Sequence, residues 1–384
     1  MQDIRLQGLS LGNSDSIPMH LFSPYPLGAL TLPNRIAVSP MCQYSSSDGF
    51  ATDWHLVHLG SRAVGGAGLV MMEATAVSPE GRITPGDMGL WKDAQIEKLK
   101  QITDFIRTQG AYAGIQLAHA GRKASMAVPW EEVRLLPPEE GGWTNVVAPS
   151  AVQFDRQYAT PAALDHAGIR RIVEAFGASA RRAAKAGFDM VEIHSAHGYL
   201  LHSFLSPLSN RREDEYGGAF QNRIRLLLEV VDVVREELPG KSPLLVCISA
   251  TDWAEGGWDV DQSVALAKIL RTHRVELMDI SSGGLVPYAQ ITAGPGYQTP
   301  FAERIRREAS MPTGAVGFIT GAVQADQIIR TGQADIVFIA REFLRNPYWP
   351  LEAAKEVHQQ IAWPKQYLRA AAAGTAQRNG LLDD

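Results

Sequence analysis

Residues 191–199 read VEIHSAHGY, so that three polar rings directly follow an apolar run. The apolar part has the β-branched character of a short buried strand. His194, His197 and Tyr199 would then lie at the C-terminal end of that strand, where an α/β barrel keeps its active site. A lone histidine is more often satisfied in a polar loop. Three polar rings so close together instead favour a site that donates hydrogen bonds or protons to a ligand.

Other predicted strands also end in small or polar residues, which together form a ring of candidate binding groups. They are residues 39–44, 73–75, 116–123, 281–284, Gly317 and 340–341. Small residues at the last two strand ends, backed by Arg341, suit a phosphate cradle, because backbone N–H groups and a guanidinium can both face an anion. Arg341 could equally form a salt bridge at the barrel end. Carboxylates are scarce in this ring, which favours an organic cofactor over a metal ion.

Eight apolar runs of β character recur along the chain and must position these groups. They cover residues 35–38, 68–73, 113–118, 190–194, 244–249, 277–281, 314–318 and 335–339. Helical periodicity lies between them, for example over 94–108, 168–186, 222–237, 263–273 and 325–331, with N-caps predicted at Asp93 and Asp261 and helix ends at Gly110, Gly187 and Gly332.

This alternation predicts a single-domain (β/α)8 TIM barrel with long excursions after strands 3 and 4, over residues 121–163 and 200–220. Both excursions should lie on the active-site side, as pocket walls or as surface decoration. A doubly wound sheet is the alternative, but it would usually carry a GxGxxG turn after its first strand, and SPMC at 39–42 is not one.

Composition excludes several classes of protein. The 384 residues carry a formal net charge of −5 and no basic run, which disfavours nucleic acid and anionic membrane as partners. Only two cysteines are present, Cys42 and Cys247, too few for an iron–sulfur cluster and typical of a reduced, cytoplasmic setting. We expect residues 1–20 to be a loosely held extension, 21–360 the barrel, and 361–384 a C-terminal tail.

Four motifs make the chain resemble the old yellow enzymes, a family of flavin-dependent ene-reductases, and in particular their thermophilic-like subclass, which contains the xenobiotic reductases. They are PMCQY at 40–44, QLAHAGRK at 116–123, HSAHGY at 194–199 and SNRREDEYGG at 209–218. They occur in the order in which the family carries them. The resemblance extends over about residues 21–370.

The resemblance implies an FMN across the C-terminal mouth of the barrel. The positions that match its cofactor-binding residues are Ser39, Pro40, Met41, Cys42, Ala74, Gln116, Cys247, Gly317, Ala340 and Arg341. Residues 39–42 would run under the flavin ring, Ala74 and Gln116 would bind its pyrimidine edge, and the last three positions would hold the phosphate.

The implied reaction takes hydride from NADPH or NADH and passes it, in ping-pong order, from flavin N5 to the β-carbon of an α,β-unsaturated carbonyl compound. His194 and His197 would bind the carbonyl oxygen with help from Tyr44, and Tyr199 would protonate the α-carbon. Two N–H donors suit an oxygen on which negative charge develops, and a phenol can act as the acid. Metal ligation by the two histidines is the alternative.

Two positions depart from the family pattern. Cys247 stands where the family has an arginine beside the flavin N1/O2 edge, so flavin should be harder to reduce and bind more weakly. Ala340 replaces a glycine of the phosphate cradle. A second interpretation follows, in which the barrel binds flavin or phenols with little turnover. The resemblance also implies a homodimer, or a dimer of dimers, in which Arg369 of the tail reaches a neighbouring active site.

Overall fold

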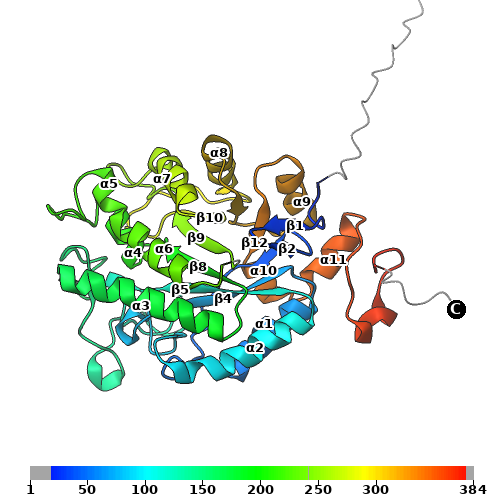
Figure 1. Cartoon of the computed structure of the whole chain (residues 1–384), viewed down its shortest axis with the longest axis horizontal. Helices are drawn as coiled ribbons and strands as arrows, with labels where there is room; N and C mark the ends of the chain where they lie inside the picture. Colours follow the sequence, from blue (N-terminus) through cyan, green and yellow to red (C-terminus); the bar gives the residue numbers. More distant parts are fainter. Residues whose placement is uncertain (1–18, 241, 378–384) are drawn as a thin grey trace, which may run out of the picture.

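The computed structural model describes residues 19–240 and 242–377, and a closed barrel of eight parallel strands forms its centre (Figure 1). The strands follow the order β10-β11-β12-β3-β4-β5-β8-β9 around the barrel. They are β3 (Ile36–Val38), β4 (Leu69–Ala76), β5 (Tyr112–Ala118), β8 (Met190–Ser195), β9 (Leu244–Ser249), β10 (Leu277–Ser281), β11 (Thr313–Ala315) and β12 (Ile336–Ile339). Each corresponds to one of the predicted apolar runs, so the predicted fold is confirmed.

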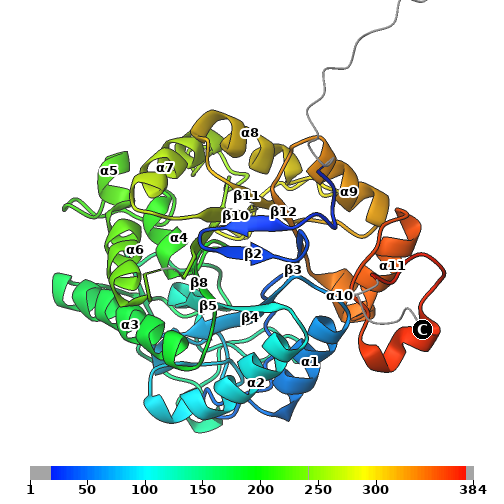
Figure 2. The same cartoon turned by 45° about the vertical axis from the view of Figure 1, so that its right-hand side comes forward.

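Helices follow the strands and surround the barrel, as Figure 2 shows along its axis. They are α1 (Asp53–Val64), α2 (Ile96–Thr108), α3 (His166–Lys185), α4 (Leu200–Leu205), α5 (Phe220–Arg223), α6 (Arg225–Glu237), α7 (Val260–Thr272), α8 (Thr299–Ala309), α9 (Ala322–Arg330), α10 (Arg341–Arg345) and α11 (Trp349–Glu356). The longer ones are amphipathic: in α3 the buried positions include Ile169, Ile172 and Phe176, three or four residues apart. This spacing gives each helix one apolar face to lay on the barrel.

The helix ends agree with the predicted glycines and disagree with the predicted N-caps. Positive φ angles of 81°, 85° and 72° directly follow α2, α3 and α9, at Gly110, Gly187 and Gly332. The N-cap of α7, however, is Asp259, whose side chain accepts the Gln262 N–H at 2.9 Å, and Asp261 lies in the first turn. Asp93 begins a 3-10 turn ahead of α2 and does not cap the helix. Because the helix dipole also favours acidic residues inside the first turn, composition alone does not fix the cap.

A short hairpin closes the barrel end opposite the predicted site. Strands β1 (Tyr25–Leu27) and β2 (Leu30–Leu32) pair antiparallel and lie across the barrel in Figure 2. Their buried side chains join an apolar cluster with barrel residues that include Met190, Leu245 and Leu277. Side chains in strands alternate in direction, so residues two positions further along β8, β9 and β10 form the next interior layer. That layer faces the opposite mouth of the barrel.

Two long connections follow β5 and β8, where the excursions were predicted. The first carries the paired strands β6 (Val147–Ala148) and β7 (Ala162–Ala163), and the second continues from α4 to α5. Arg212 of the second donates a hydrogen bond to the Pro149 carbonyl of the first at 3.0 Å. Trp143 and Ala159 of the first pack in a small apolar cluster with Tyr199. The two connections therefore support each other beside the barrel mouth and build a wall of the site.

The predicted N-terminal extension lies almost wholly outside the described residues. At the other end, a 3-10 helix over Lys365–Ala370 follows α11, and the ring of Tyr367 packs edge-on against Tyr348 with centroids 5.9 Å apart. Within residues 19–240 and 242–377, no helix has the length and apolar character needed to cross a membrane.

Candidate active site

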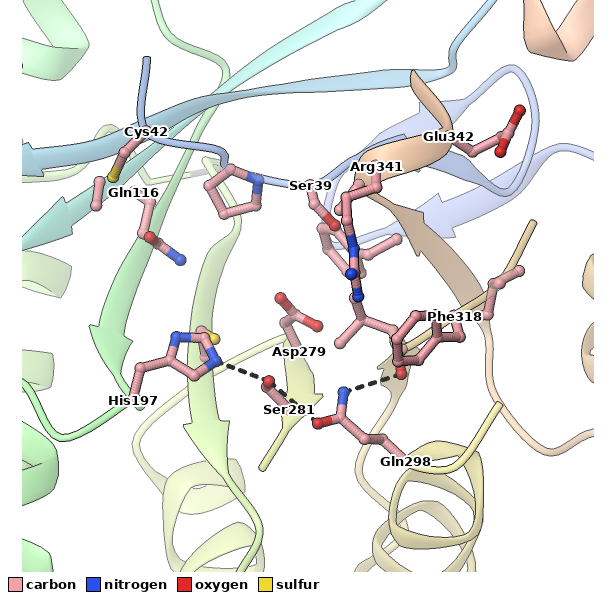
Figure 3. Close-up of a pocket in the computed structure, with 18 of the residues that line it drawn as sticks. Ser39, Cys42, Gln116, His197, Asp279, Ser281, Gln298, Phe318, Arg341 and Glu342 are labelled. Atoms are coloured by element: carbon pink, nitrogen blue, oxygen red, sulfur yellow. Dashed lines mark hydrogen bonds between the residues drawn. The ribbon is translucent and has the colours of Figure 1, made fainter. Parts of the chain in front are cut away.

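A cavity of about 340 Å³ opens at the C-terminal ends of the barrel strands. Most of the predicted site residues line it: Ser39, Pro40, Cys42, Ala74, Gln116, His194, His197, Tyr199, Cys247, Gly317, Ala340 and Arg341. Figure 3 shows Cys42, Gln116 and His197 at one end of this cavity and Arg341 with Phe318 at the other. Groups that are more than two hundred residues apart in sequence therefore meet here, because parallel strands end at the same barrel mouth.

Three predicted residues do not line the cavity. Met41 is partly buried against the main hydrophobic core. Tyr44 lies outside the cavity lining, next to Cys42, and its ring meets Trp130 edge-on with ring centroids 6.0 Å apart. Arg369 lies on an exposed face of the C-terminal 3-10 helix. Tyr44 is therefore placed to act through Cys42 or at the rim, and Arg369 is solvent-exposed in the single chain.

The two histidines line the cavity side by side, with one ring nitrogen of each close to the other. His194 Nδ1 accepts the Ala196 N–H at 3.2 Å, which leaves the proton on Nε2. His194 Nε2 lies 3.4 Å from His197 Nδ1, and the two rings are nearly perpendicular. On its far side, His197 Nε2 lies 2.7 Å from the Ser281 hydroxyl (Figure 3). If that hydroxyl donates, His197 carries its proton on Nδ1, and each imidazole has an N–H group that a bound oxygen could accept.

Burial keeps both imidazoles neutral at physiological pH. It lowers the pKa of His197 to about 3 and the pKa of His194 well below its usual value, with smaller contributions from Lys123 and from the neighbouring histidines. Neutral rings can donate through one nitrogen and accept through the other. The pair therefore acts through oriented hydrogen bonds.

The backbone around His197 is held in an unusual conformation. His197 has a φ of 58°, and its N–H donates to Ser249 Oγ at 3.0 Å. Lys123 Nζ donates to the His197 carbonyl at 2.8 Å and to the Gly284 carbonyl. Non-glycine residues rarely adopt positive φ, and they cluster at functional sites when the surroundings fix them. The turn that carries His197 is therefore rigidly positioned.

Tyr199 stands beside this pair. Its ring meets His194 edge-on with centroids 5.1 Å apart, and it lines the cavity. Burial, followed by the nearby Cys42, raises the pKa of Tyr199 well above its usual value. The phenol therefore stays protonated and is available as an acid.

Glu73 anchors the segment that follows β3. The sequence indicates this glutamate only as part of the strand end at residues 73–75. Glu73 occupies an irregularity in the register between β4 and β5. Its carboxylate accepts the Gln43 N–H at 2.8 Å and lies 3.2 Å from His55 Nε2. Glu73 thus fixes the course of residues 40–44 under the cavity and acts as a positioning residue.

The far end of the cavity suits an anion. The Arg341 guanidinium lies over the Phe318 ring, 4.3 Å from its centroid, and Arg345 lines the same end. Gly317 has a φ of 115°, and a Cβ there would lie 2.9 Å from the Gln298 amide nitrogen. This close approach leaves backbone accessible where a phosphate could bind.

These features fit FMN, with one exception at the cavity floor. Ser39 Oγ is buried and has no hydrogen-bond partner, so it is free for a ligand. Asp279 also lines the cavity, and Glu192 lies beside it, each with an unpartnered carboxylate oxygen. The expectation that the ring is poor in carboxylates is wrong here. The cavity floor therefore presents the carboxyl groups of Glu192 and Asp279, with Cys247 beside them. The resemblance implies a positively charged arginine at position 247.

The site residues that sequence analysis missed are mainly inside strands or brought in by loops. Asp279 and Glu192 lie within β10 and β8. Only the alternation of side chains along a strand, which turns both toward the barrel interior, could have marked them as site residues. Gln298 precedes α8, and its amide accepts the Ser282 hydroxyl at 2.6 Å and donates to the Val316 carbonyl at 3.1 Å. No local motif marks it.

Comparison with known proteins agrees with this geometry. The family model described as "NADH:flavin oxidoreductase / NADH oxidase family" matches residues 20–360. An NADPH dehydrogenase of Geobacillus thermodenitrificans is 50% identical over 351 residues, which cover 91% of this chain and 98% of that protein. An NADPH dehydrogenase of Bacillus licheniformis is 49% identical over 352 residues, with the same coverage.

Solved structures show the same fold. Morphinone reductase superposes with a TM-score of 0.75 at 29% identity, covering 91% of this chain and 93% of that one. An old yellow enzyme homologue from Zymomonas mobilis gives 0.73 at 27% identity, covering 92% of this chain and 99% of that one.

Proposed function

Since the chain belongs to the NADH:flavin oxidoreductase / NADH oxidase family, which includes the old yellow enzymes, and is thus a flavin-dependent oxidoreductase with FMN as its cofactor, we propose that it is an ene-reductase. It takes hydride from NADPH or NADH and reduces the activated C=C bond of α,β-unsaturated carbonyl compounds. The observation that carries the proposal is the pair of neutral imidazoles that line the cavity with ring nitrogens 3.4 Å apart.

The chain's residues divide between holding the cofactor and polarising the substrate. Arg341 and Gly317 would hold the phosphate of FMN, and Ser39, Ala74 and Gln116 would contact its ring system. When bound, the flavin supplies the hydride chemistry, and the protein contributes orientation and electrostatics.

Polarisation of the substrate falls to His194 and His197. Hydride addition to the β-carbon builds negative charge on the carbonyl oxygen, and preorganised N–H donors stabilise that charge most when water is excluded. Both side chains are held by hydrogen bonds on their far sides, so they need no reorganisation at the moment of reaction. Tyr199, whose raised pKa keeps it protonated, supplies the proton to the α-carbon. Tyr44 supports the oxygen site from the rim.

The test separates the two half-reactions in stopped flow, with NADPH as donor and 2-cyclohexenone as acceptor. His194→Ala and His197→Ala should each slow reoxidation by the enone about 100-fold, the usual cost of one oxyanion donor. Both should also weaken binding of a phenol, while flavin reduction changes less. His273→Ala, at the exposed end of α7, is the matched control. Wild-type reoxidation rates in both cavity variants would refute the carbonyl clamp.

A second candidate function is a barrel that binds flavin or phenols and turns over little. The acidic floor beside Cys247 favours it, because negative charge near the ring opposes flavin reduction. Anaerobic NADPH should bleach the bound flavin in an ene-reductase, and the enone should restore the colour. Intact phenol binding without bleaching would favour the binding protein.

The remaining expectations concern the setting of the enzyme. A cytoplasmic location accords with the two free cysteines. A homodimer, or a dimer of dimers, would give the exposed Arg369 a neighbouring cavity to enter. Arg369→Ala should then raise the KM for the enone without changing the FMN content, and light scattering gives the oligomeric state.

A further inference from the structure

Three ligand-type side chains lie together at the floor of the cavity. Glu192, Cys247 and Asp279 come from the adjacent strands β8, β9 and β10, and Cys247 pairs directly with Asp279 in the register. They belong to the interior layer above the apolar cluster formed with the hairpin. One ligand atom from each residue lies within 4.8 Å of the others. Figure 3 shows Asp279 pointing into the cavity between His197 and Arg341.

All three side chains are buried, and two acceptor atoms lack partners. The exposed fractions are 0% for Glu192, 2% for Cys247 and 4% for Asp279. Gln116 donates to Glu192 Oε1 at 2.7 Å, which leaves Glu192 Oε2 without a partner, and Asp279 Oδ1 has none either. A buried carboxylate without a donor or cation is costly, and two side by side are more so.

No cation of the protein answers these carboxylates within residues 19–240 and 242–377. None of the ion pairs found there includes Glu192 or Asp279. The nearest basic rings, His194 and His197, are kept neutral by burial. Burial raises the pKa of Glu192 well above its usual value and that of Asp279 to about 7, so the carboxyls can hold protons when no cation is bound. Their unpartnered oxygens remain available to a cation that comes from outside the chain.

We propose that Glu192, Cys247 and Asp279 bind a divalent transition metal of the zinc class, with the fourth coordination position open toward the cavity. Cys247 Sγ, Glu192 Oε2 and one Asp279 oxygen are the ligands. On binding, the thiol loses its proton to solvent, together with any proton held by the carboxyls, so the metal and its three ligands carry a net charge of −1.

The geometry needs only a small contraction. Zinc bonds of about 2.3 Å to sulfur and 2.0 Å to oxygen place tetrahedral ligands about 3.5 Å apart. The ligand atoms here lie within 4.8 Å of one another. Side-chain movements of about 1 Å would bring them to the separations of a tetrahedral zinc site. A thiolate combined with two carboxylates and low coordination suits zinc, whereas calcium and magnesium prefer six or more oxygen ligands.

A second cluster must be separated from this site in any assay. His166 lies 3.1 Å from Glu215 and 3.6 Å from Asp214, on the surface, and such exposed groups can bind metal adventitiously. His166→Gln removes its nitrogen ligand. This variant is therefore the parent for the experiment.

The experiment uses the full-length, flavin-loaded His166→Gln protein, reduced and stripped with a chelator. Zinc sulfate is added, free zinc is removed by desalting, and zinc per chain is measured by plasma mass spectrometry together with the zinc K-edge absorption spectrum. We expect about one zinc per chain with one sulfur neighbour. Less than about one tenth of that amount, or a shell without sulfur, would overturn the proposal.

Three variants assign the ligands. Cys247→Ser and Asp279→Asn should each weaken zinc retention at least tenfold, about the minimum expected for a lost ligand. Cys247→Arg should abolish retention, because it removes the thiolate ligand and places a guanidinium that can donate hydrogen bonds to both carboxyls. Cys42→Ser removes the other thiol of the cavity and should keep both the zinc and the sulfur neighbour. A sulfur signal that survives Cys247→Ser and disappears in Cys42→Ser would refute the assignment, and circular dichroism verifies that each variant is folded.

Discussion

At the scale of single residues, the chemistry of the site depends on where one proton sits. His197 can clamp an oxyanion only if its proton is on Nδ1, and Ser281 is the group that decides this, since its hydroxyl lies 2.7 Å from His197 Nε2. The neighbouring Ser282 hydroxyl occupies the Gln298 carbonyl at 2.6 Å. The Ser281 hydroxyl also reaches the Gln298 carbonyl, but at 3.5 Å, so its contact with His197 is the shorter of the two and the one on which the tautomer depends. Ser281 acts through His197 and is a positioning residue.

Ser281→Ala should release the tautomer of His197. We expect enone reoxidation to fall about tenfold, less than the loss of a whole donor, because both tautomers are then populated. The ¹⁵N shifts of labelled histidine should change from mainly Nδ1–H to a mixture. Ser282→Ala loses a hydrogen bond of similar length in the same turn but keeps the His197 contact, so its effect should be smaller. Unchanged nitrogen shifts in Ser281→Ala would show that Ser281 does not set the tautomer.

The sequence predicted those site residues that stand at strand ends within a local motif. His194, His197 and Tyr199 could be found because their types and spacing are visible in one short stretch. Ser281 was visible as part of a strand end, but its role depends on a distance across two strands. Asp279 was not found, because a single acidic residue inside an apolar run gives no indication of which neighbours it faces.

At the scale of elements, a buried histidine–aspartate pair, His202 and Asp252, holds the turn after β8 in place. The Gly198 N–H donates to His202 Nδ1 at 2.9 Å, and His202 Nε2 lies 2.9 Å from Asp252. Asp252 also accepts the Ser206 hydroxyl at 2.6 Å. The turn is therefore tied both to α4 and to the loop that follows β9. The turn after β8 also contacts the turn after β10, where Gly198 approaches Gly284.

This contact makes Gly198 a sensitive position. Gly198 has a φ of 77°, and a Cβ there would lie 2.3 Å from the Gly284 carbonyl oxygen. Gly198→Ala should displace His197, lower the unfolding free energy by about 1–3 kcal/mol and slow enone reoxidation at least tenfold. Gly218→Ala is the matched control, because its φ of 74° is similar while nothing lies within 4 Å of its added Cβ. Equal losses in both variants, measured by urea unfolding and stopped flow, would show that backbone strain alone is responsible.

Elements were predictable from the sequence where burial is uniform. The barrel strands are buried on both faces and read as continuous apolar runs, so each was located. The β1–β2 hairpin escaped notice because three-residue strands carry too little periodicity. The cap of α7 was misplaced by two residues because Asp259 and Asp261 are both chemically suitable.

At the scale of the whole molecule, buried histidines and buried carboxyls make opposite contributions to acid sensitivity. Burial lowers the pKa of His58 to about 3 and that of His119 to about 4, while it raises the pKa of Asp87 to about 7. Below pH 6.5 the unfolded chain binds protons at its histidines that the folded chain refuses, which destabilises the fold. Between about pH 4 and 7 the folded carboxyls hold protons that the unfolded chain releases, and acid then stabilises the fold. The two contributions partly cancel, so the pH dependence of overall stability identifies no single group.

A single substitution isolates one of these contributions. His119 is 2% exposed, and its Nδ1 accepts the Gly121 N–H at 3.0 Å. In His119→Asn the side-chain oxygen keeps that acceptor and cannot titrate, so any cavity cost is the same at every pH. The pKa of His119 is lowered on folding, so the unfolded state binds more protons between pH 6.5 and 4, and wild-type stability falls as pH falls through this window. The wild type should lose about 2 kcal/mol more than the variant between pH 7 and pH 5, measured by urea unfolding at both values. An equal loss in the two proteins would mean that His119 is protonated in the folded barrel, with the arriving proton on Nδ1 and the hydrogen bond from the Gly121 N–H lost.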